Sequence, residues 1–227
     1  MNNLAIIPAR GGSKRIPRKN IKDFLGKPII AYSIEIALKS GLFGEVMVST
    51  DDKEIAMIAE KFGARVPFYR SDQTANDYAT LADVIDEVKV QYLYLGHSFE
   101  NMCCILPTAP LITLENLRKG LEMLHFNKDA DSVWPIVRFS YPIQRSLKLQ
   151  NGRIEMYHPE YYNTRSQDLE PAFHDAGQFY WMKFHSNLCD QNRLGLEIKE
   201  IECQDIDSIE DWNIAELKYK ALTGFLK

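Results

Sequence analysis

The sequence lacks the features that mark secreted, membrane-spanning and zinc-binding proteins. Its 227 residues include four cysteines, none of them in a C-x-x-C pair, and the histidines form no H-E-x-x-H segment. No apolar run approaches the roughly 18 residues that a membrane span requires. Polar Asn2-Asn3 leads directly into a short apolar run, which is unlike a signal peptide. These absences predict a reduced, cytoplasmic protein with no membrane association and no zinc site.

The chain also lacks a surplus of positive charge. It has 27 Lys and Arg residues against 31 Asp and Glu residues, which gives a formal net charge of -4 at pH 7. General nucleic-acid binding usually needs a basic face, so this balance argues against a nucleic-acid partner. A hydrophobic content of 45% is typical of a soluble globular protein. The length allows one large α/β domain, or a core with a small appended lobe.

The stretch at residues 4–14 carries the first functional signal. It opens with the apolar run of a buried strand, breaks at Pro8 and Gly11-Gly12, and then presents Arg10 and Lys14 among further cations. Glycines let backbone N–H groups approach an anion and cations neutralise it, so such a loop can hold phosphate. Neither G-x-x-x-x-G-K-[ST] nor G-x-G-x-x-G is present, and a solvated basic turn is the alternative.

Apolar periodicity predicts an alternation of strands and helices. We expect strands at 4–7, 45–50, 66–69, 102–106 and 131–137, with helices between them, and further strands at 177–184 and 198–203. An S-x-x-D box at Ser208 and Asp211 begins the last helix. This order predicts an α/β fold with a mostly parallel sheet and helices on both faces. Ligands bind such sheets beyond the carboxyl ends of the strands, where Arg10, Arg70 and Thr108 are expected.

The composition changes after Arg138. Residues 139–172 are rich in Tyr, Pro and Arg, and an Asn-Gly turn at 151–152 separates two short strand-like runs. We expect a small β-rich lobe at 139–172, inserted into an α/β domain formed by 1–138 and 173–227. Its aromatic residues would suit a subunit interface. A decorated loop that covers one edge of the sheet is the alternative.

Asp205 and Asp207 are candidate metal ligands. They stand two residues apart at the expected end of the 198–203 strand, where period-2 alternation puts both carboxylates on one side of the backbone. Two oxygen ligands on one face can hold a magnesium ion that keeps several waters and takes phosphate oxygens. The alternative is local, with Asp207 or Ser208 capping the helix and Asp205 solvated.

Taken together, the motifs resemble those of a known family along the whole chain. The relevant segments, in order, are Ile7-Pro-Ala-Arg-Gly-Gly-Ser-Lys14, Gly26-Lys27-Pro28, Ser49-Thr50-Asp51-Asp52, Arg70, Pro107-Thr108-Ala109-Pro110-Leu111 and Asp205-Ile-Asp-Ser-Ile-Glu-Asp-Trp212. This combination resembles the CMP–sugar-acid synthetases, or acylneuraminate cytidylyltransferases. Tyr141-Pro-Ile-Gln-Arg145 and Phe173-His-Asp-Ala-Gly-Gln-Phe-Tyr-Trp181 are most similar to the pseudaminic acid cytidylyltransferase branch.

The resemblance implies a Rossmann-like nucleotidyltransferase fold with a protruding dimerisation lobe, and therefore a homodimer. It implies that CTP and a nine-carbon 2-keto sugar acid react with Mg²⁺ present to give a CMP-sugar and pyrophosphate. The residues implied in nucleotide binding are Ala9, Arg10, Gly11, Gly12, Ser13, Lys14, Lys19, Asn20, Arg70, Thr80 and Thr108. Of these, Arg10, Lys14 and Lys19 would act in catalysis together with Asp207, and Asp205 and Asp207 would bind the metal.

Four residues are expected near the sugar: Leu106, Arg165, His174 and Gln178, with Arg165 pairing with its carboxylate. Relatives that activate sialic acid commonly have Gln-Pro-Thr where this chain has Leu106-Pro107-Thr108. They also tend to have Asn-Gly-Ala at 176–178, which is Ala-Gly-Gln here. These differences favour pseudaminic acid. The same chemistry on sialic, legionaminic or ketodeoxyoctulosonic acid is the alternative, and a non-catalytic nucleotide-binding module is a remoter one.

Overall fold

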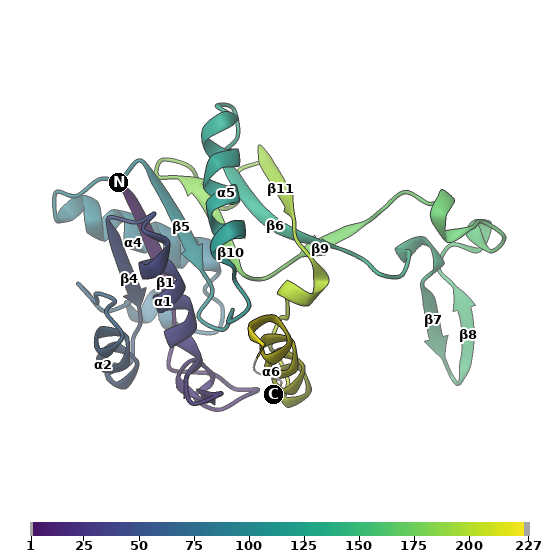
Figure 1. The fold of residues 1–227 in the computed structure, drawn as a ribbon, viewed down its shortest axis with the longest axis horizontal. Coiled ribbons are helices and arrows are strands. Elements are labelled where there is room, and N and C mark those ends of the chain that lie inside the picture. Colours follow the sequence, from purple (N-terminus) through teal and green to yellow (C-terminus); the bar gives the residue numbers. More distant parts are fainter. Residues whose placement is uncertain (1, 225–227) are drawn as a thin grey trace.

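The computed structural model describes residues 2–224, which form a seven-stranded sheet with helices packed on it (Figure 1). The strand order is β11-β6-β10-β5-β1-β4, and β9 pairs with β6 outside this path. These strands are β1 (Asn3–Pro8), β4 (Glu45–Ser49), β5 (Asn101–Ile105), β6 (Ser132–Arg138), β9 (Phe173–Asp175), β10 (Phe179–Lys183) and β11 (Arg193–Glu197). The short strands β2 (Asp23–Phe24) and β3 (Lys27–Pro28) pair separately.

The helices are α1 (Ile29–Ser40), α2 (Lys53–Lys61), α3 (Asp72–Ala75), α4 (Leu81–Tyr94), α5 (Leu114–Phe126) and α6 (Ile209–Thr223). The predicted capping box of Ser208 and Asp211 at the start of α6 is present. Gly41, with φ at 65°, ends α1. Within residues 2–224, none of the helices combines the length and the apolar composition that crossing a membrane requires.

The directions of the strands confirm a mostly parallel sheet. β1 lies between β4 and β5 and is parallel to both, and β11 is parallel to β6. β10 runs antiparallel between β5 and β6, and β9 runs antiparallel to β6. The carboxyl ends of β1, β4 and β5 therefore meet at one edge, which is where the loops that follow them can form a site.

Alternation along the central strands gives the sheet two apolar faces. In β1, Ala5 and Ile7 belong to a core shared with α1, α2 and α5, whereas Leu4 and Ile6 belong to a core shared with α4. All four side chains are fully buried, and burying one such Leu or Ile contributes about 1.5–3 kcal/mol. The predicted placement of helices on both faces is therefore confirmed.

The strand expected at 66–69 is wrong. Arg65 forms a single bridge to Met47, and the segment rejoins the end of β4 only where Arg70 donates its backbone N–H to Thr50 O at 2.9 Å. Pro67 lies between these contacts and has no N–H to donate. A short apolar run thus follows the sheet edge without becoming a strand.

The strand expected at 198–203 is also wrong, because the strand lies earlier, at β11. Residues Glu200–Glu202 instead form a 3-10 helix. Gly195 interrupts the apolar pattern of β11 and concealed it, since glycine weakens a strand signal. The structure shows why glycine is there, because a Cβ at this position would lie 2.6 Å from Ile136 Cδ1 on β6.

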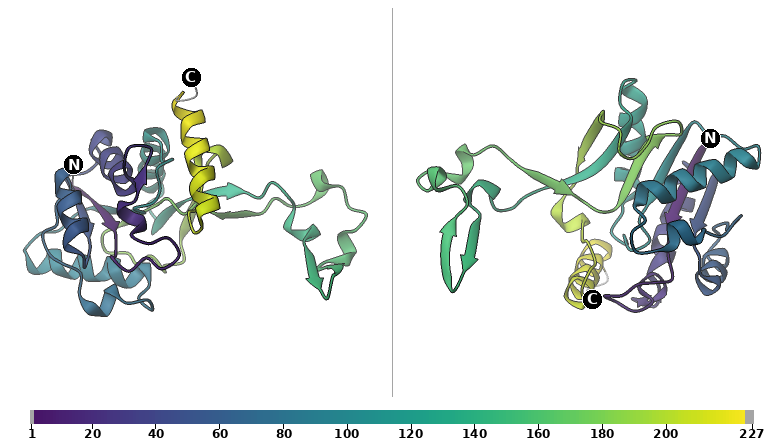
Figure 2. Two further views of the ribbon diagram at one scale, coloured as in Figure 1. Left: turned by 90° about the horizontal axis from the view of Figure 1, so that it is seen from below. Right: turned by 180° about the vertical axis from the view of Figure 1, so that it is seen from behind.

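Between β6 and β9 the chain leaves the body of the protein and forms a long arm (Figures 1 and 2). The arm carries the predicted hairpin, with β7 (Leu147–Gln150) and β8 (Arg153–Met156) joined by the Asn-Gly turn. Short 3-10 helices occupy Ile143–Arg145, Pro159–Tyr161 and Ser166–Asp168. The domain boundaries at 138 and 173 and the role of this arm in dimerisation stay predictions.

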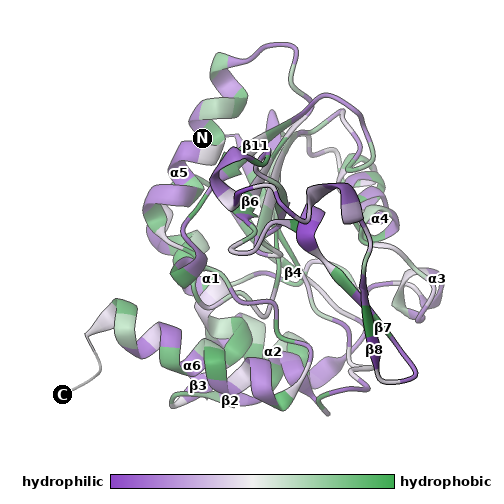
Figure 3. Cartoon of the chain, turned by 90° about the vertical axis from the view of Figure 1, so that its right-hand side faces the viewer, coloured by the Kyte–Doolittle hydropathy of each residue, from purple (hydrophilic) through white to green (hydrophobic). Residues whose placement is uncertain are grey.

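The hairpin carries both hydrophobic and hydrophilic residues (Figure 3), and exposed hydrophobic residues share one of its faces. Leu147 pairs with Met156 and Leu149 pairs with Ile154, so their side chains share one face. Leu149 is 71% exposed and Ile154 is 66% exposed. The opposite face is polar and includes the ion pair between Lys148 and Glu155 at 2.8 Å. An isolated hairpin of this kind buries little apolar surface of its own.

Asp52 joins α2 to the loop that follows β1. As the N-cap of α2 it accepts hydrogen bonds from Glu54 N at 2.9 Å and Ile55 N at 3.0 Å, and it forms an ion pair with Arg18. The hydrogen bond from Arg18 lowers the pKa of Asp52 from its ordinary 3.8 to about 2. Folding therefore favours the ionised carboxylate, and the resulting stability is lost as the pH falls through this range.

We expect Asp52→Ala to lower the melting temperature by about 2–4 °C at pH 7, because losing an N-cap costs about 1 kcal/mol. The difference from the wild type should shrink as the pH is lowered from about 4 towards about 2, where Asp52 becomes protonated. Thermal melts followed by circular dichroism between pH 7 and pH 2 would measure this difference. Glu60→Gln, on the same helix, is the control. A difference independent of pH would contradict the assigned role of the charge.

Candidate active site

A basic cleft of about 680 Å³ lies beyond the carboxyl ends of β1 and β5. One wall comes from the loop after β1, another from the segment between Arg70 and α4, and the floor from the turn after β5. The predicted residues that line it are Arg10, Ser13, Lys14, Lys19, Asn20, Arg70, Thr80, Leu106 and Thr108. Parallel pairing of the central strands thus gathers groups that are far apart in sequence.

The loop after β1 is held by the end of β4. Ala9 N donates to Ser49 O at 2.9 Å, and Gly11 N donates to Asp51 Oδ1 at 2.9 Å. A Cβ on Gly11 would lie 2.7 Å from Asp52 Oδ2, so only glycine fits this approach. Asn20, which is nearly buried, donates from Nδ2 to Arg10 O at 3.0 Å. Ala9, Gly11 and Asn20 therefore shape the loop.

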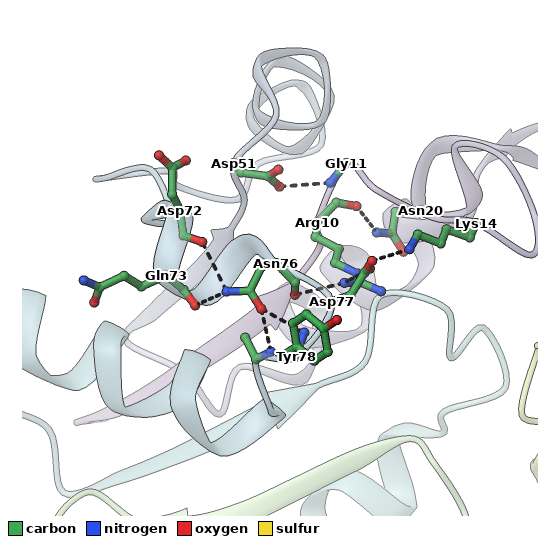
Figure 4. Close-up of polar contacts among 11 residues, drawn as sticks. Arg10, Gly11, Lys14, Asn20, Asp51, Asp72, Gln73, Asn76, Asp77 and Tyr78 are labelled. Carbon is green, nitrogen blue, oxygen red and sulfur yellow. Dashed lines mark hydrogen bonds and ion pairs between the residues drawn. The ribbon is translucent and has the colours of Figure 1, made fainter.

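Arg10 and Lys14 are paired with a carboxylate from the opposite wall of the basic cleft (Figure 4). Arg10 Nη1 lies 2.9 Å from Asp77 Oδ1, and Lys14 Nζ contacts Asp77 Oδ2. Arg10 Nη1 also donates to the carbonyl of Asn76 at 3.1 Å. Sequence reasoning missed Asp77, because it lies in an aperiodic polar loop and only the fold brings it to these cations.

Arg70 is buried against the end of β4. Its Nη2 donates to Ser49 O at 2.8 Å and its Nε donates to Ser49 Oγ at 3.2 Å. Burial lowers the pKa of Arg70, and the negative charge of Asp51 opposes this shift. Within residues 2–224, no hydrogen bond uses Nη1 of Arg70, so this side chain retains donors for a ligand in the basic cleft.

Thr80 reaches the basic cleft as the N-cap of α4. Its hydroxyl donates to Asp83 Oδ2 at 2.7 Å, and Asp83 N donates back to Thr80 Oγ1 at 3.2 Å. This capping box fixes the start of α4. The backbone N–H of Thr80 also donates to Asp83 Oδ2 at 2.8 Å, and its carbonyl accepts from Val84 N at 3.3 Å.

A smaller acidic cleft of about 360 Å³ contains Asp205 and Asp207 together with His174. The two aspartates follow a 3-10 helix, so the premise that they end a strand is wrong, although both line this cleft. Asp211 orders the segment, because its Oδ2 accepts from Asp207 N at 3.1 Å and from Ser208 N at 2.8 Å. Ser208 is the N-cap of α6 and forms the capping box with Asp211. The side chain of Asp207 takes no part in this cap.

The acidic cleft is linked to the basic loop by two cations. Arg15 Nη1 lies 2.6 Å from Asp207 Oδ2, and Lys19 Nζ lies 3.7 Å from Asp207 Oδ1. Lys19 also donates to the carbonyl of Ile206 at 2.6 Å. Lys19 therefore lines the basic cleft and contacts the acidic segment at once, which couples the positions of the two.

Asp205 has the electrostatic setting of a cation ligand. Within residues 2–224, no ion pair reaches its carboxylate, and the clusters of three or more acidic, His or Cys side chains that would form a complete metal site are absent. The pKa of Asp205 is raised mainly because its carboxylate is partly withdrawn from water, and to a smaller extent because Asp207 carries a negative charge nearby. A divalent cation would relieve this repulsion and take its other ligands from water and substrate.

The four residues expected near the sugar are not all brought together. Leu106 lines the basic cleft and His174 lines the acidic cleft. Gln178 is only 2% exposed, donates from Nε2 to the carbonyl of Glu202, and lines neither cleft. Its position at the start of β10 turns it into the protein. Arg165 is exposed and lines neither cleft. It lies on the arm, which projects from the body of the protein (Figure 2).

Comparison with known proteins identifies the family. The model of a family described as cytidylyltransferase matches residues 4–201. The pseudaminic acid cytidylyltransferase of Campylobacter jejuni is 41% identical over 227 residues, covering 97% of each chain. The CMP-N,N'-diacetyllegionaminic acid synthase of Legionella pneumophila is 38% identical over 230 residues, covering 95% of each chain.

A solved structure shares the fold. It is that of a CMP:2-keto-3-deoxy-manno-octonic acid synthetase complexed with CTP, which superposes with a TM-score of 0.72 at 18% identity and covers 99% of each chain. At this identity the likeness concerns the fold alone. The family match and the sequence relatives extend across the strands and loops that form the basic cleft. The chain therefore belongs to the cytidylyltransferase family of enzymes, as its motifs predicted.

Proposed function

We propose that this enzyme transfers CMP from CTP to pseudaminic acid, giving CMP-pseudaminic acid and pyrophosphate. The observation that carries the proposal is the basic cleft, which gathers Arg10, Lys14, Lys19 and the buried Arg70 at the carboxyl edge of a parallel sheet. The choice of sugar acid is supported by the relatives that are named pseudaminic acid cytidylyltransferase. The free cysteines of the chain fit a reducing compartment, so we propose the cytoplasm as its location.

In this reaction the anomeric hydroxyl of the sugar acid attacks the α-phosphorus of CTP in line with the leaving pyrophosphate. A P–O bond to the sugar forms, the bond between the α-phosphorus and the bridging oxygen breaks, and the hydroxyl proton leaves to solvent. Arg10, Lys14 and Lys19 would neutralise the charge that builds on the phosphate oxygens. Arg70 would donate to the cytosine ring through its free Nη1, as planar guanidinium groups do.

Asp205 and Asp207 would hold magnesium between the basic and acidic clefts. When bound, the ion would supply positive charge to the phosphates and lower the pKa of the attacking hydroxyl. Lys19 and Arg15 already contact the Asp207 segment, so they would keep its carboxylate close to the phosphate loop. His174, which lines the acidic cleft, is placed to contact a sugar held there.

The proposed activity is tested by pyrophosphate release from CTP with a panel of sugar acids. We expect release with pseudaminic acid and much less with sialic, legionaminic or ketodeoxyoctulosonic acid, with chelation of magnesium abolishing it. Turnover with one of the other acids would keep the chemistry and replace the substrate. CTP binding without pyrophosphate release from any sugar would support the non-catalytic nucleotide-binding module instead.

For the metal site, we expect Asp207→Ala and Asp205→Asn each to lower kcat on the order of 100-fold or more, because charge stabilisation at the phosphates is lost. Both variants should keep the wild-type melting temperature within a few degrees. Glu210→Gln removes one exposed charge close by on α6 and is the matched control, expected to leave kcat unchanged. Full activity of Asp207→Ala with magnesium would refute the assignment.

We also propose a homodimer in which the arm's hairpin packs against a second copy. Its exposed apolar face, formed by Leu147, Leu149, Ile154 and Met156, is the surface that association would cover. Arg165 lies on the same arm, so a second copy could receive it at its sugar site.

We expect Leu149→Glu to convert a dimer into a monomer in sedimentation or light scattering, because a charge would be buried on the apolar face. Gln150→Glu adds the same charge on the opposite face of the hairpin and should leave the dimer intact. In the monomer, the KM for the sugar should rise more than the KM for CTP if Arg165 acts across the interface. A wild-type monomer in solution would contradict the homodimer.

A further inference from the structure

The pairing of Asp77 with Arg10 and Lys14 points to a carboxylate that competes with the phosphates. These two ion pairs join the opposite walls of the basic cleft (Figure 4). Within residues 2–224, Arg10 and Lys14 form ion pairs with no other carboxylate. The cations that the proposed reaction needs for phosphate are therefore already occupied by one side chain of the protein.

We propose that Asp77 is an internal competitor for the phosphate site. It holds Arg10 and Lys14 when no phosphate is bound, is displaced by the triphosphate, and returns to the two cations as pyrophosphate leaves. This inference rests on the proposed function, since it concerns the phosphates of the same reaction. Its effect is to limit how tightly the enzyme holds pyrophosphate, and hence to speed release of that product.

The segment that carries Asp77 has hydrogen bonds of its own, besides the one that Asn76 O accepts from Arg10. Asn76 closes a turn around it, because its Oδ1 accepts from Tyr78 N at 2.8 Å and Ala79 N at 3.0 Å. The Nδ2 of Asn76 donates to Gln73 O at 2.6 Å. Loss of the ion pairs would therefore leave this local turn intact.

The base of the segment is fastened to α4. Ser71 N donates to Glu87 Oε1 at 2.9 Å, and the Thr74 hydroxyl donates to Oε2 of the same carboxylate. Hydrogen bonds to Asn76 and to Glu87 fix the conformation of the segment. This conformation places Asp77 next to the loop that carries Arg10 and Lys14. The competition is thus built into the fold of the segment.

Exposure and charge make the ion pairs exchangeable. The side chains of Arg10, Lys14 and Asp77 are 36%, 76% and 41% exposed, so water screens both contacts. A phosphate group offers more oxygens and more negative charge than one carboxylate, so it binds the two cations more strongly and displaces Asp77. A partly exposed ion pair is worth about 0.2–1 kcal/mol. Removing the competition from both pairs therefore corresponds to about a 2- to 30-fold gain in affinity for the phosphate ligand.

The test measures binding of inorganic pyrophosphate and of CTP by calorimetry in the wild type and in Asp77→Asn. We expect the Kd of pyrophosphate to fall about 2- to 30-fold in Asp77→Asn, with stronger product inhibition by pyrophosphate in the steady state. Asp77→Glu keeps the charge and should bind pyrophosphate like the wild type. Asp72→Asn is the matched control, since this carboxylate lies on the same segment and points away from the cations (Figure 4).

An unchanged or higher Kd for pyrophosphate in Asp77→Asn would overturn the inference, and a higher one would make Asp77 a support of the phosphate site. Equal tightening in Asp72→Asn would reduce the effect to general charge and would also overturn it. If Asp77→Asn were poorly folded, Asp77→Ser would replace it in the same comparison. Wild-type protein that binds CTP and pyrophosphate but never releases pyrophosphate with a sugar acid would refute the proposed function and leave the competition measurable.

Discussion

The parallel pairing of β1 between β4 and β5 is the constraint on which the clefts depend. It brings the ends of three strands to one edge, so that the loop after β1 can bond to the end of β4 through Ala9, Gly11 and Arg18. Gly11 is required because Asp52 lies where a Cβ would be. The basic loop is therefore rigidly placed before any ligand arrives, which is the preorganisation that electrostatic catalysis requires.

Charges in both clefts are neutralised by exchangeable partners. Asp77 forms ion pairs with Arg10 and Lys14. Asp207 forms ion pairs with Arg15 and Lys19, and all four contacts are partly exposed. Such pairs contribute little to stability. Because these pairs are partly exposed, each side chain can exchange its partner for another ligand at small cost. The protein thus holds opposite charges close together in partly exposed pairs, whereas Arg70 is buried and hydrogen-bonded to Ser49.

The sequence predicted what depends on local patterns. The apolar run of β1, the capping box of α6 and the Asn-Gly hairpin each carry their signal within a few residues, and each is present. Prediction failed where tertiary contacts override the pattern. Gly195 weakens the sequence signal of β11, and glycine is needed there because the Ile136 side chain occupies the position next to its Cα. No strand forms at 66–69, because Pro67 has no backbone N–H to donate. Asp77 and the burial of Gln178 depend on pairings across the fold that no local spacing encodes.

The arm poses a separate energetic question, because a two-stranded hairpin is marginally stable on its own in water. Its polar face has the Lys148–Glu155 pair, but its apolar face meets solvent in the single chain. Exposed β-branched and leucine side chains on a hairpin that projects this far would favour association. A second copy could bury this face without an open edge, since a twofold arrangement closes on itself. On that view the arm holds its conformation through the partner, and the residues it carries, Arg165 among them, are ordered only where the assembly needs them.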